Sequence, residues 1–351
     1  MIDFAANRID ALLVSSLPNV RYLSGFTGSN AMVLLQPDSL TLFTDPRYTI
    51  QAAEEAEGAK LPAKVVIAKK HLWQAAVEAI KRKRLKRIGF EETKLTFDSY
   101  SSLKEALAGR ILRPRGTLIE DLRTVKTEDE IARIRRAVQT NSKAFEAVTK
   151  RLKPGTSEQQ IAAGLDYQMR RLGAEGTAFE TIVASGVRSA LPHARPTDRK
   201  LGTDELLLID MGAAQDGYMS DMTRTLFLAK PGSRIRSMYD AVLDAQLAAI
   251  AAVREGVSTN QVDAAARNVL RKANLEREFV HSTGHGLGLE IHEAPRIGKK
   301  DKTRLKAGMV ITIEPGAYVE GVGGVRIEDT VLVTKTGCEV LTPTPKELMI
   351  L

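Results

Sequence analysis

Two segments about 100 residues apart repeat one pattern, and this duplication limits the possible folds more than any other feature of the sequence. The segment KPGTSEQQIAAGLDYQMRRLG, which starts at Lys153, resembles REGVSTNQVDAAARNVLRKAN, which starts at Arg254. Each follows a long predicted helix, turns at a glycine and begins a second helix at a serine that can cap it. If the two halves are related, chemistry in one half should recur in the other about 100 residues later.

Acidic residues recur at matching places inside apolar strand patterns. Asp210 ends the run LLLIDMG, and Glu314 ends the run VITIEPG. Asp221 lies in YMSDMTRTLFL, and Glu328 lies in GVRIEDTVLV. A charge inside an apolar strand is costly unless it is paired or bound to a metal, so the recurrence indicates a function. The alternative, surface strands with solvated acids, fits poorly with neighbours such as Leu-Leu-Ile and Ile-Thr-Ile.

The segment between Asp210 and Asp221 predicts a β-hairpin, because Asp216-Gly217 favours a tight turn. A two-residue loop at Gln215-Asp216 would place the two aspartates directly opposite each other. A loop at Asp216-Gly217 would shift the pairing but keep both on one face, because side chains alternate along a strand. Two carboxylates this close cannot both stay ionised without a cation between them, so one is protonated or a cation is bound.

A metal site accounts for this set of acids. The four acids and the imidazole of His285, in HSTGHGLGLEIHE, suit hard or borderline divalent metals, and bridging carboxylates suit two metals about 3.5–4 Å apart. Other metal and nucleophile motifs are absent from the sequence. His292-Glu293 does not continue as H-E-x-x-H, one cysteine (Cys338) cannot form a cysteine-pair zinc site, and no G-x-S-x-G elbow occurs.

The N-terminal part of the chain alternates short apolar strands with helical patterns, which is typical of an α/β layer domain. The clearest of these patterns cover residues 11–14, 31–35, 72–83 and 87–90. Thr127, with Glu130 three residues later, forms a capping box that opens a new helix. We therefore expect two domains, residues 1–123 and 124–351, in a chain of the α/β (α+β) class.

Composition excludes several classes of protein. The chain has 43% hydrophobic and 27% charged residues, which excludes a mainly disordered protein. With one cysteine, no signal-peptide pattern and no apolar stretch of ~18 residues, we expect a cytoplasmic protein with no membrane partner. The net charge of +8 includes a basic run at residues 81–87, which we interpret as a solvated helix end because no nucleic-acid motif accompanies it. We therefore expect no nucleic-acid partner.

The motifs DMGAAQDGYMSDMTRT, HSTGHGLGLEIHE, ITIEPG and GVRIED resemble those of the pita-bread metallopeptidases. Within that superfamily the chain is similar to the Xaa-Pro branch, which contains prolidase and aminopeptidase P. The segments NVRYLSGFTGSN and TDPRY resemble the creatinase-like N-terminal domain of the same branch. The resemblance implies a creatinase-like α/β domain over residues 1–123. It also implies a pita-bread domain over residues 124–351, with two pseudo-twofold helix-helix-hairpin halves.

The resemblance also implies a ligand set for two divalent metal ions. Asp210 would chelate one ion, and His285 with Glu314 would chelate the other. Asp221 and Glu328 would bridge them. By ligand hardness the expected metal is Mn²⁺, although Co²⁺, Zn²⁺ and Fe²⁺ would also bind such a set.

The catalytic roles implied by the resemblance involve three side chains. A water or hydroxide held between the metals would be the nucleophile, and Glu314 would take its proton. His292 would support the oxyanion, and His193 would line the substrate pocket. His193 in LPHARP and His292 in IHEAP recur in the two halves, although an isolated histidine is more often structural. His281 has no assigned role, and Arg326 is expected either to bond to the acids or merely to offset their charge.

The substrate implied by the resemblance is a peptide or dipeptide with proline at the second position. The residues do not decide between a dipeptidase and an aminopeptidase acting on longer chains, and Phe179 and Tyr218 are candidate walls of the proline pocket. The resemblance also suggests a homodimer. Two alternatives are a binding module that has kept the fold without catalysis and a metal-free creatinase-like hydrolase. Both are disfavoured because all the expected ligand positions are filled.

Overall fold

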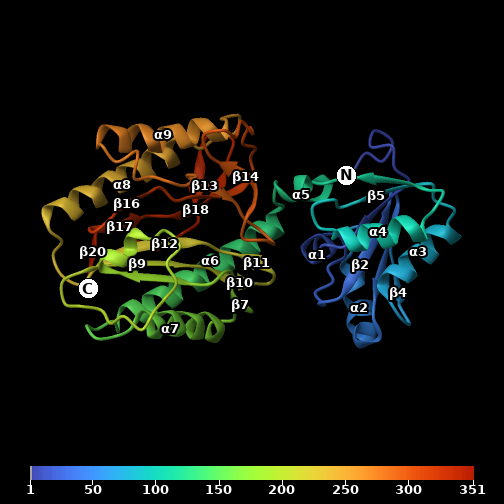
Figure 1. The fold of residues 1–351 in the computed structure, drawn as a ribbon, viewed down its shortest axis with the longest axis horizontal. Coiled ribbons are helices and arrows are strands. Elements are labelled where there is room, and N and C mark those ends of the chain that lie inside the picture. The colour runs from blue at the N-terminus through green and yellow to red at the C-terminus, as the bar shows by residue number, and fades with distance from the viewer. Residues whose placement is uncertain (1) are drawn as a thin grey trace. The chain divides into compact units, whose positions relative to one another are not determined.

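The computed structural model describes residues 2–351, which fold into two compact units. The first unit ends at Arg123, and the second runs from Thr124 to Leu351. Figure 1 labels the elements of both units in chain order. No helix within the described residues is long and apolar enough to cross a membrane.

The first unit is a mixed β-sheet with helices on both faces. The strand order is β4-β3-β2-β1-β5-β6, with antiparallel pairing through β1, β2 and β3 and parallel pairing elsewhere. Successive residues of β1 face opposite cores, because Leu13 packs in a cluster with Ile80 of α3, whereas Leu12 packs in a cluster with Leu23 of α1. The predicted α/β layer arrangement is therefore confirmed. The elements are β1 (Ala11–Val14), α1 (Leu17–Ser24), β2 (Ala31–Gln36), β3 (Ser39–Thr44), α2 (Thr49–Glu55), β4 (Ala63–Ile67), α3 (Leu72–Arg82), β5 (Arg87–Phe90), α4 (Phe97–Ala106), β6 (Ile111–Pro114) and α5 (Leu118–Arg123).

The second unit contains two copies of a pattern in which a pair of helices precedes a long β-hairpin. The first copy comprises α6 (Glu128–Thr149), α7 (Glu158–Arg171), β7 (Gly176–Thr177), β8 (Ile182–Ser185), β9 (Leu206–Met211), β10 (Ala213–Gln215), β11 (Tyr218–Met219) and β12 (Met222–Phe227). The second comprises α8 (Ser233–Ala252), α9 (Thr259–Lys272), β13 (Gly284–Gly286), β14 (Glu293–Ile297), β15 (Val310–Ile313), β16 (Gly316–Val319), β17 (Gly323–Arg326) and β18 (Asp329–Val333). The short strands β19 (Cys338–Val340) and β20 (Met349–Ile350) complete the chain. The predicted duplication of helix-helix-hairpin halves is confirmed.

Helix starts in this unit follow the sequence signals. Thr127 and Glu130 form the predicted capping box at the start of α6. Ser157 caps α7, and Ser258 caps α9, each in a capping box with a glutamine. These caps satisfy backbone N–H groups that a helix end leaves without partners.

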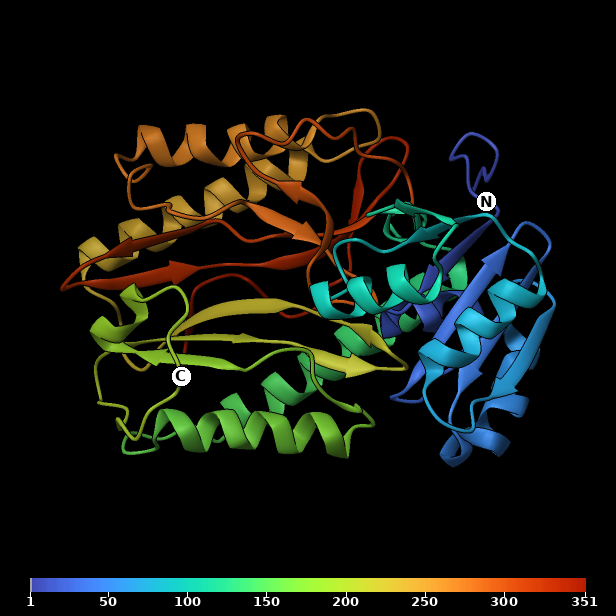
Figure 2. The same ribbon diagram turned by 45° about the vertical axis from the view of Figure 1, so that its right-hand side comes forward.

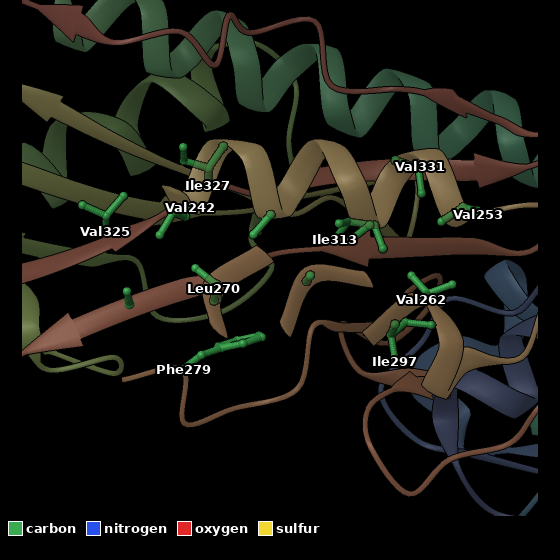
Figure 3. Close-up of a cluster of buried hydrophobic side chains, with 14 of the residues drawn as sticks. Val242, Val253, Val262, Leu270, Phe279, Ile297, Ile313, Val325, Ile327 and Val331 are labelled. Carbon is green, nitrogen blue, oxygen red and sulfur yellow. The ribbon is translucent and has the colours of Figure 1, made fainter. Parts of the chain in front are cut away.

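The strands of the second unit lie between the two helix pairs. Figures 1 and 2 show α6 and α7 on one side of the strands and α8 and α9 on the other. Figure 3 shows part of the core beneath the second pair, a cluster of buried side chains that includes Val242 of α8, Leu270 of α9, and Ile313 and Val331 of the strands. Each helix pair buries its apolar face against one half of the sheet, and the acids lie along the strands between them.

The two hairpins join through β12, which lies beside β17 and β18. The backbone N–H of Glu328 donates to the carbonyl of Thr223 at 3.1 Å. The hydroxyl of Thr330 donates to the carbonyl of Asp221 at 2.9 Å. These bonds bring the acidic positions of one half next to those of the other.

Candidate metal centre

The first hairpin turns at Asp216 and Gly217, both of which have positive φ, at 52° and 79°. This turn pairs Asp210 with Thr223 in the β9–β12 ladder. The direct pairing of Asp210 with Asp221 is therefore wrong, and the alternative register with a loop at Asp216-Gly217 is confirmed. Asp221 lies in the short break between β11 and β12, just before the ladder resumes.

The second hairpin places its two acids at opposing positions. Strands β15 and β18 pair up to Ile313 and Asp329. The next residues along the two strands are Glu314 and Glu328, which lie between this ladder and that of β16 with β17. Continuous register across the break therefore aligns Glu314 with Glu328, which the sequence pattern did not predict.

His285 brings an imidazole into the same cluster from β13. Its Nε2 lies 3.5 Å from Oδ2 of Asp221 and 3.5 Å from Oε1 of Glu314. One potential ligand atom from each of Asp221, His285 and Glu328 lies within 4.8 Å of the other two. Such spacing allows the three side chains to bind a common cation.

The ring of His285 is held in the form that a metal requires. Its Nδ1 donates to the carbonyl of Gly286 at 3.1 Å, so Nε2 keeps a lone pair. Burial lowers the pKa of His285 to about 4. The imidazole is therefore neutral near pH 7, as a metal ligand must be.

The acids repel one another inside the protein. Burial is the largest cause of a raised pKa at Asp221, Glu314 and Glu328, and each carboxyl is raised further by the charge of its acidic neighbours. The pKa of Glu314 rises to about 8. A cluster of this kind becomes fully ionised near neutral pH when cations offset its charge.

Two carboxylate oxygens at the cluster have no hydrogen-bond partner within residues 2–351. They are Oδ1 of Asp210 and Oε1 of Glu328, and both are buried. The second oxygen of each acid is engaged, since Asp210 accepts from Arg326 at 2.6 Å and Glu328 accepts from Thr223 at 2.8 Å. An acid with one anchored oxygen and one free oxygen is positioned to bind a metal, so the residues present fit divalent cations.

Of the two expected roles of Arg326, the structure has the bonded one, with Asp210 as the acid that it holds. Its side chain is 3% exposed and donates to Oδ2 of Asp210 at 2.6 Å and to the hydroxyl of Thr223 at 3.0 Å. It also donates to the hydroxyl of Tyr318 at 2.6 Å. The guanidinium therefore fixes one oxygen of Asp210 and leaves the other free.

His281 is bonded at both ring nitrogens. Its Nδ1 donates to the carbonyl of Ser282 at 2.8 Å, and its Nε2 lies 2.8 Å from the hydroxyl of Tyr318. Burial lowers the pKa of His281 to about 3. With no free lone pair, His281 supports Tyr318 and does not act as a ligand.

The cluster opens into a cavity of about 750 Å³. The predicted site residues all line it: His193, Asp210, Asp221, His285, His292, Glu314 and Glu328. The ring of His292 contacts that of His285 edge to face, with centroids 4.4 Å apart. Phe179 also lines the cavity. Tyr218 is not among its described lining residues, because its hydroxyl donates to Glu130 at 2.9 Å in a buried position.

Sequence reasoning missed several side chains that touch the site. Thr223 could have been found, because it lies two residues after Asp221 and alternation puts both on one face. Arg296, which lines the cavity, and Tyr318, which joins His281 to Arg326, carry no local signal. Their positions follow from strand pairing and from the packing of distant segments.

Comparison with known proteins identifies relatives over the whole chain. The family profile "Metallopeptidase family M24" matches residues 132–335, and "Creatinase/Prolidase N-terminal domain" matches residues 3–125. An Xaa-Pro dipeptidase of Pyrococcus furiosus is 39% identical over 344 residues, which is 98% of this chain and 96% of the relative.

Solved structures of similar proteins have the same fold. An Xaa-Pro dipeptidase from Bacillus anthracis superimposes with a TM-score of 0.95 at 38% identity, covering 99% of this chain and 97% of the other. An X-Pro aminopeptidase from Thermotoga maritima superimposes with a TM-score of 0.91 at 34% identity, covering 99% of this chain and 100% of the other. The fold is therefore shared by proteins of both names.

Proposed function

Because this chain belongs to metallopeptidase family M24, we propose that it cleaves the bond between an N-terminal residue and a following proline, with Xaa-Pro dipeptides as its preferred substrates. The observation that carries this proposal is the convergence of acids from both halves, and one imidazole, on one cavity. Relatives named Xaa-Pro dipeptidase and X-Pro aminopeptidase supply the substrate class.

Five side chains would hold two divalent metal ions. Asp210 would bind one ion, His285 and Glu314 would bind the other, and Asp221 and Glu328 would bridge both. The free oxygens of Asp210 and Glu328 and the free Nε2 of His285 support these roles. When bound, the two ions supply a water of lowered pKa and polarise the scissile carbonyl.

Three side chains would carry out the proton transfer and substrate contacts. Glu314 would accept the proton of the attacking water, because its carboxylate lies in the cavity within 3.5 Å of the proposed ligand atom of His285. His292, whose ring lies against that of His285, would donate an N–H to the carbonyl oxygen as negative charge develops there. His193, which is exposed on the cavity wall, would contact the bound peptide.

The metal we propose is Mn²⁺. Four of the five proposed ligands are carboxylates, whose hard oxygen atoms suit Mn²⁺. The fifth ligand is an imidazole, which also suits Co²⁺, Zn²⁺ and Fe²⁺, so these ions would compete for the site. Metal content after reconstitution from each salt, measured by mass spectrometry together with activity, tests this assignment.

The preference for dipeptides rests on Arg296. The other arginines of the cavity wall are paired: Arg195 with Glu180 and Arg326 with Asp210. The exposed guanidinium of Arg296 has no ion-pair partner within residues 2–351. A free carboxylate lies one residue beyond the scissile bond only in a dipeptide, so an unpaired cation on the wall favours that substrate. Arg296→Met should raise KM for an Xaa-Pro dipeptide and leave KM for its C-terminal amide nearly unchanged.

We also propose that the unit Thr124–Leu351 is the catalytic domain and that the preceding unit is a creatinase-like accessory domain. Every proposed site residue lies in the second unit, which supports this division. The single cysteine suits a reducing compartment, so we place the enzyme in the cytoplasm.

The test is hydrolysis by metal-free protein reconstituted with Mn²⁺. The substrates are Ala-Pro, Ala-Pro-Ala and the control dipeptide Ala-Ala, with products resolved by chromatography. Cleavage of Ala-Pro above both other peptides supports the proposal. Cleavage of Ala-Pro-Ala in preference to Ala-Pro selects an aminopeptidase, the function named for the Thermotoga maritima structure. Failure to cleave either proline peptide overturns the Xaa-Pro assignment.

A further inference from the structure

No hydrogen bond to its ring fixes the orientation of His292 within the described residues. Within residues 2–351 no hydrogen bond holds either ring nitrogen, and the one aromatic ring that it contacts there is that of His285, edge to face. The loop that contains it, residues 287–292, forms neither helix nor strand. The position of His292 therefore depends on what holds the backbone of this loop.

The carboxylate of Glu293 lies at the centre of that loop. Its Oε1 accepts the backbone N–H of Glu290 at 3.1 Å. The backbone N–H of Gly288 donates to the carbonyl of Glu290 at 3.0 Å, which closes the turn. A Cβ on Gly288 would lie 2.8 Å from each carboxylate oxygen of Glu293, so the chain is wrapped closely around this carboxylate.

Lys126 holds the other side of the same carboxylate. Its Nζ lies 3.1 Å from Oε2 of Glu293, and the two side chains are 2% and 6% exposed. The lysine is itself anchored, because its backbone N–H donates to Gly308 at 2.9 Å and its Nζ donates to the carbonyl of Thr124 at 3.3 Å. The pair therefore ties the loop to the segment that enters β15, the strand that leads to Glu314.

We propose that the buried Lys126–Glu293 ion pair is a positioning device that holds His292 over the metal centre, so that its loss lowers turnover without removing the metals. This inference rests on the proposed function, since it assigns a support to a catalytic histidine. Lys126 is not among the described residues that line the cavity, so it would act through Glu293 and the backbone that carries His292.

Loss of the Lys126–Glu293 ion pair should have a large effect on turnover. A buried charge pair is sensitive to the loss of either partner, and Glu293 is the residue directly after His292 in the chain. A displacement of about 1 Å at a catalytic group can lower the rate roughly 100-fold. The proposed metal ligands Asp221, Glu314 and Glu328 lie outside this loop, in the breaks between β11 and β12, β15 and β16, and β17 and β18, so they should keep their places.

The test compares Lys126→Met with Lys126→Arg in the metal-loaded protein. Lys126→Met should lower kcat by about 10- to 100-fold with less than a threefold change in KM and with metal content unchanged. Lys126→Arg should restore most of kcat, because it keeps the cation. Arg133→Met, which removes a cation from the exposed pair with Asp129 on α6, is the matched control and should leave kcat unchanged.

A second variant guards against a folding failure. Glu293→Gln keeps the size of the side chain and the acceptor for Glu290 but removes the charge, and it should lower kcat in the same way. Loss of metal in step with kcat, or kcat within twofold of wild type in folded Lys126→Met, overturns the proposal. Failure of Lys126→Arg to restore kcat also overturns it.

A structural readout separates this inference from the proposed function. The chain has five histidines, so the ring signals of the Zn²⁺-loaded protein can be assigned by nuclear magnetic resonance with single variants such as His292→Ala. In Lys126→Met the His292 signal should shift or broaden, whereas that of His71 in the first unit should not. If wild type cleaves no proline peptide, the proposed function fails and this readout alone decides. An unchanged His292 signal then overturns the positioning role.

Discussion

Asp329→Asn should destabilise the second unit strongly, because Asp329 closes a buried cluster of charges between the two halves. Its Oδ1 accepts from Arg224 at 2.7 Å, and its Oδ2 accepts from Gln246 at 2.8 Å and from Lys346 at 2.5 Å. The side chains of Arg224 and Asp329 are 2% and 1% exposed. The substitution keeps the shape of Asp329 but leaves the guanidinium of Arg224 buried without this anion.

The expected cost is about 3–5 kcal/mol, the usual cost of removing one partner from a buried pair. For a domain of roughly 150–250 residues, each 1 kcal/mol corresponds to about 2–4 °C in Tm, so Tm should fall by roughly 6–20 °C. Asp240→Asn is the matched control, because Asp240 pairs with Arg236 on the surface, where the side chains are 47% and 52% exposed. Exposed pairs of this kind contribute about 0.3–0.5 kcal/mol.

The assay is urea unfolding of both variants, followed by circular dichroism, with and without metal. If the loss of unfolding free energy is the same with and without metal, it comes from the ion pair of Asp329 and not from a disturbance of Glu328, the neighbouring proposed metal ligand. Burial alone would raise the pKa of Asp329, but Arg224 and Lys346 lower it below 3.8. The stabilisation should therefore be present above about pH 4 and be lost as the pH falls further. A loss of unfolding free energy below about 1 kcal/mol at pH 7, or one equal to that of Asp240→Asn, would show that the buried pair of Asp329 and Arg224 contributes little to stability.

Three further predictions concern the site and its supports. Asp221→Ala should abolish hydrolysis and lower metal content, because it removes a bridging ligand; full metal content by mass spectrometry would contradict that role. His292→Ala should keep both metals and lose turnover, and loss of metal with rate retained would show that the assigned role is wrong. Glu158→Gln should destabilise by about 1–3 kcal/mol at pH 7, because Glu158 accepts bonds from Ser185 and Thr197 while fully buried. Burial alone would raise the pKa of Glu158, but the hydrogen bonds from Ser185 and Thr197 lower it below 4.5. The difference in stability between Glu158→Gln and wild type should therefore be present above pH 4.5 and shrink as the pH falls further. An unchanged difference in Tm at pH 3 would contradict this prediction.

Several features of the fold could be predicted because their causes are local. Capping by Thr127 involves only the next three residues, and the structure has the predicted capping box. Asp210 was predictable as a functional acid because a charge in an apolar strand requires a partner. Its recurrence in Glu314 strengthened that inference, since both halves repeat the same unit.

The register of the first hairpin could not be chosen from the sequence. Loops at Gln215-Asp216 and at Asp216-Gly217 both place Asp210 and Asp221 on one face, and alternation of side chains does not distinguish them. The structure has the second loop, because Asp216 and Gly217 both adopt positive φ. The difference decides that Thr223, and not Asp221, lies opposite Asp210.

The helix starts could be predicted because capping involves only the next three residues, and the duplication could be predicted because both halves repeat one pattern of residues. Tertiary structure alone decided which side chains support the proposed metal centre. Arg326 reaches Asp210 across 116 residues, and Lys126 reaches Glu293 across 167 residues. No local pattern encodes such pairs, because they form only when both halves have folded and packed their strands side by side.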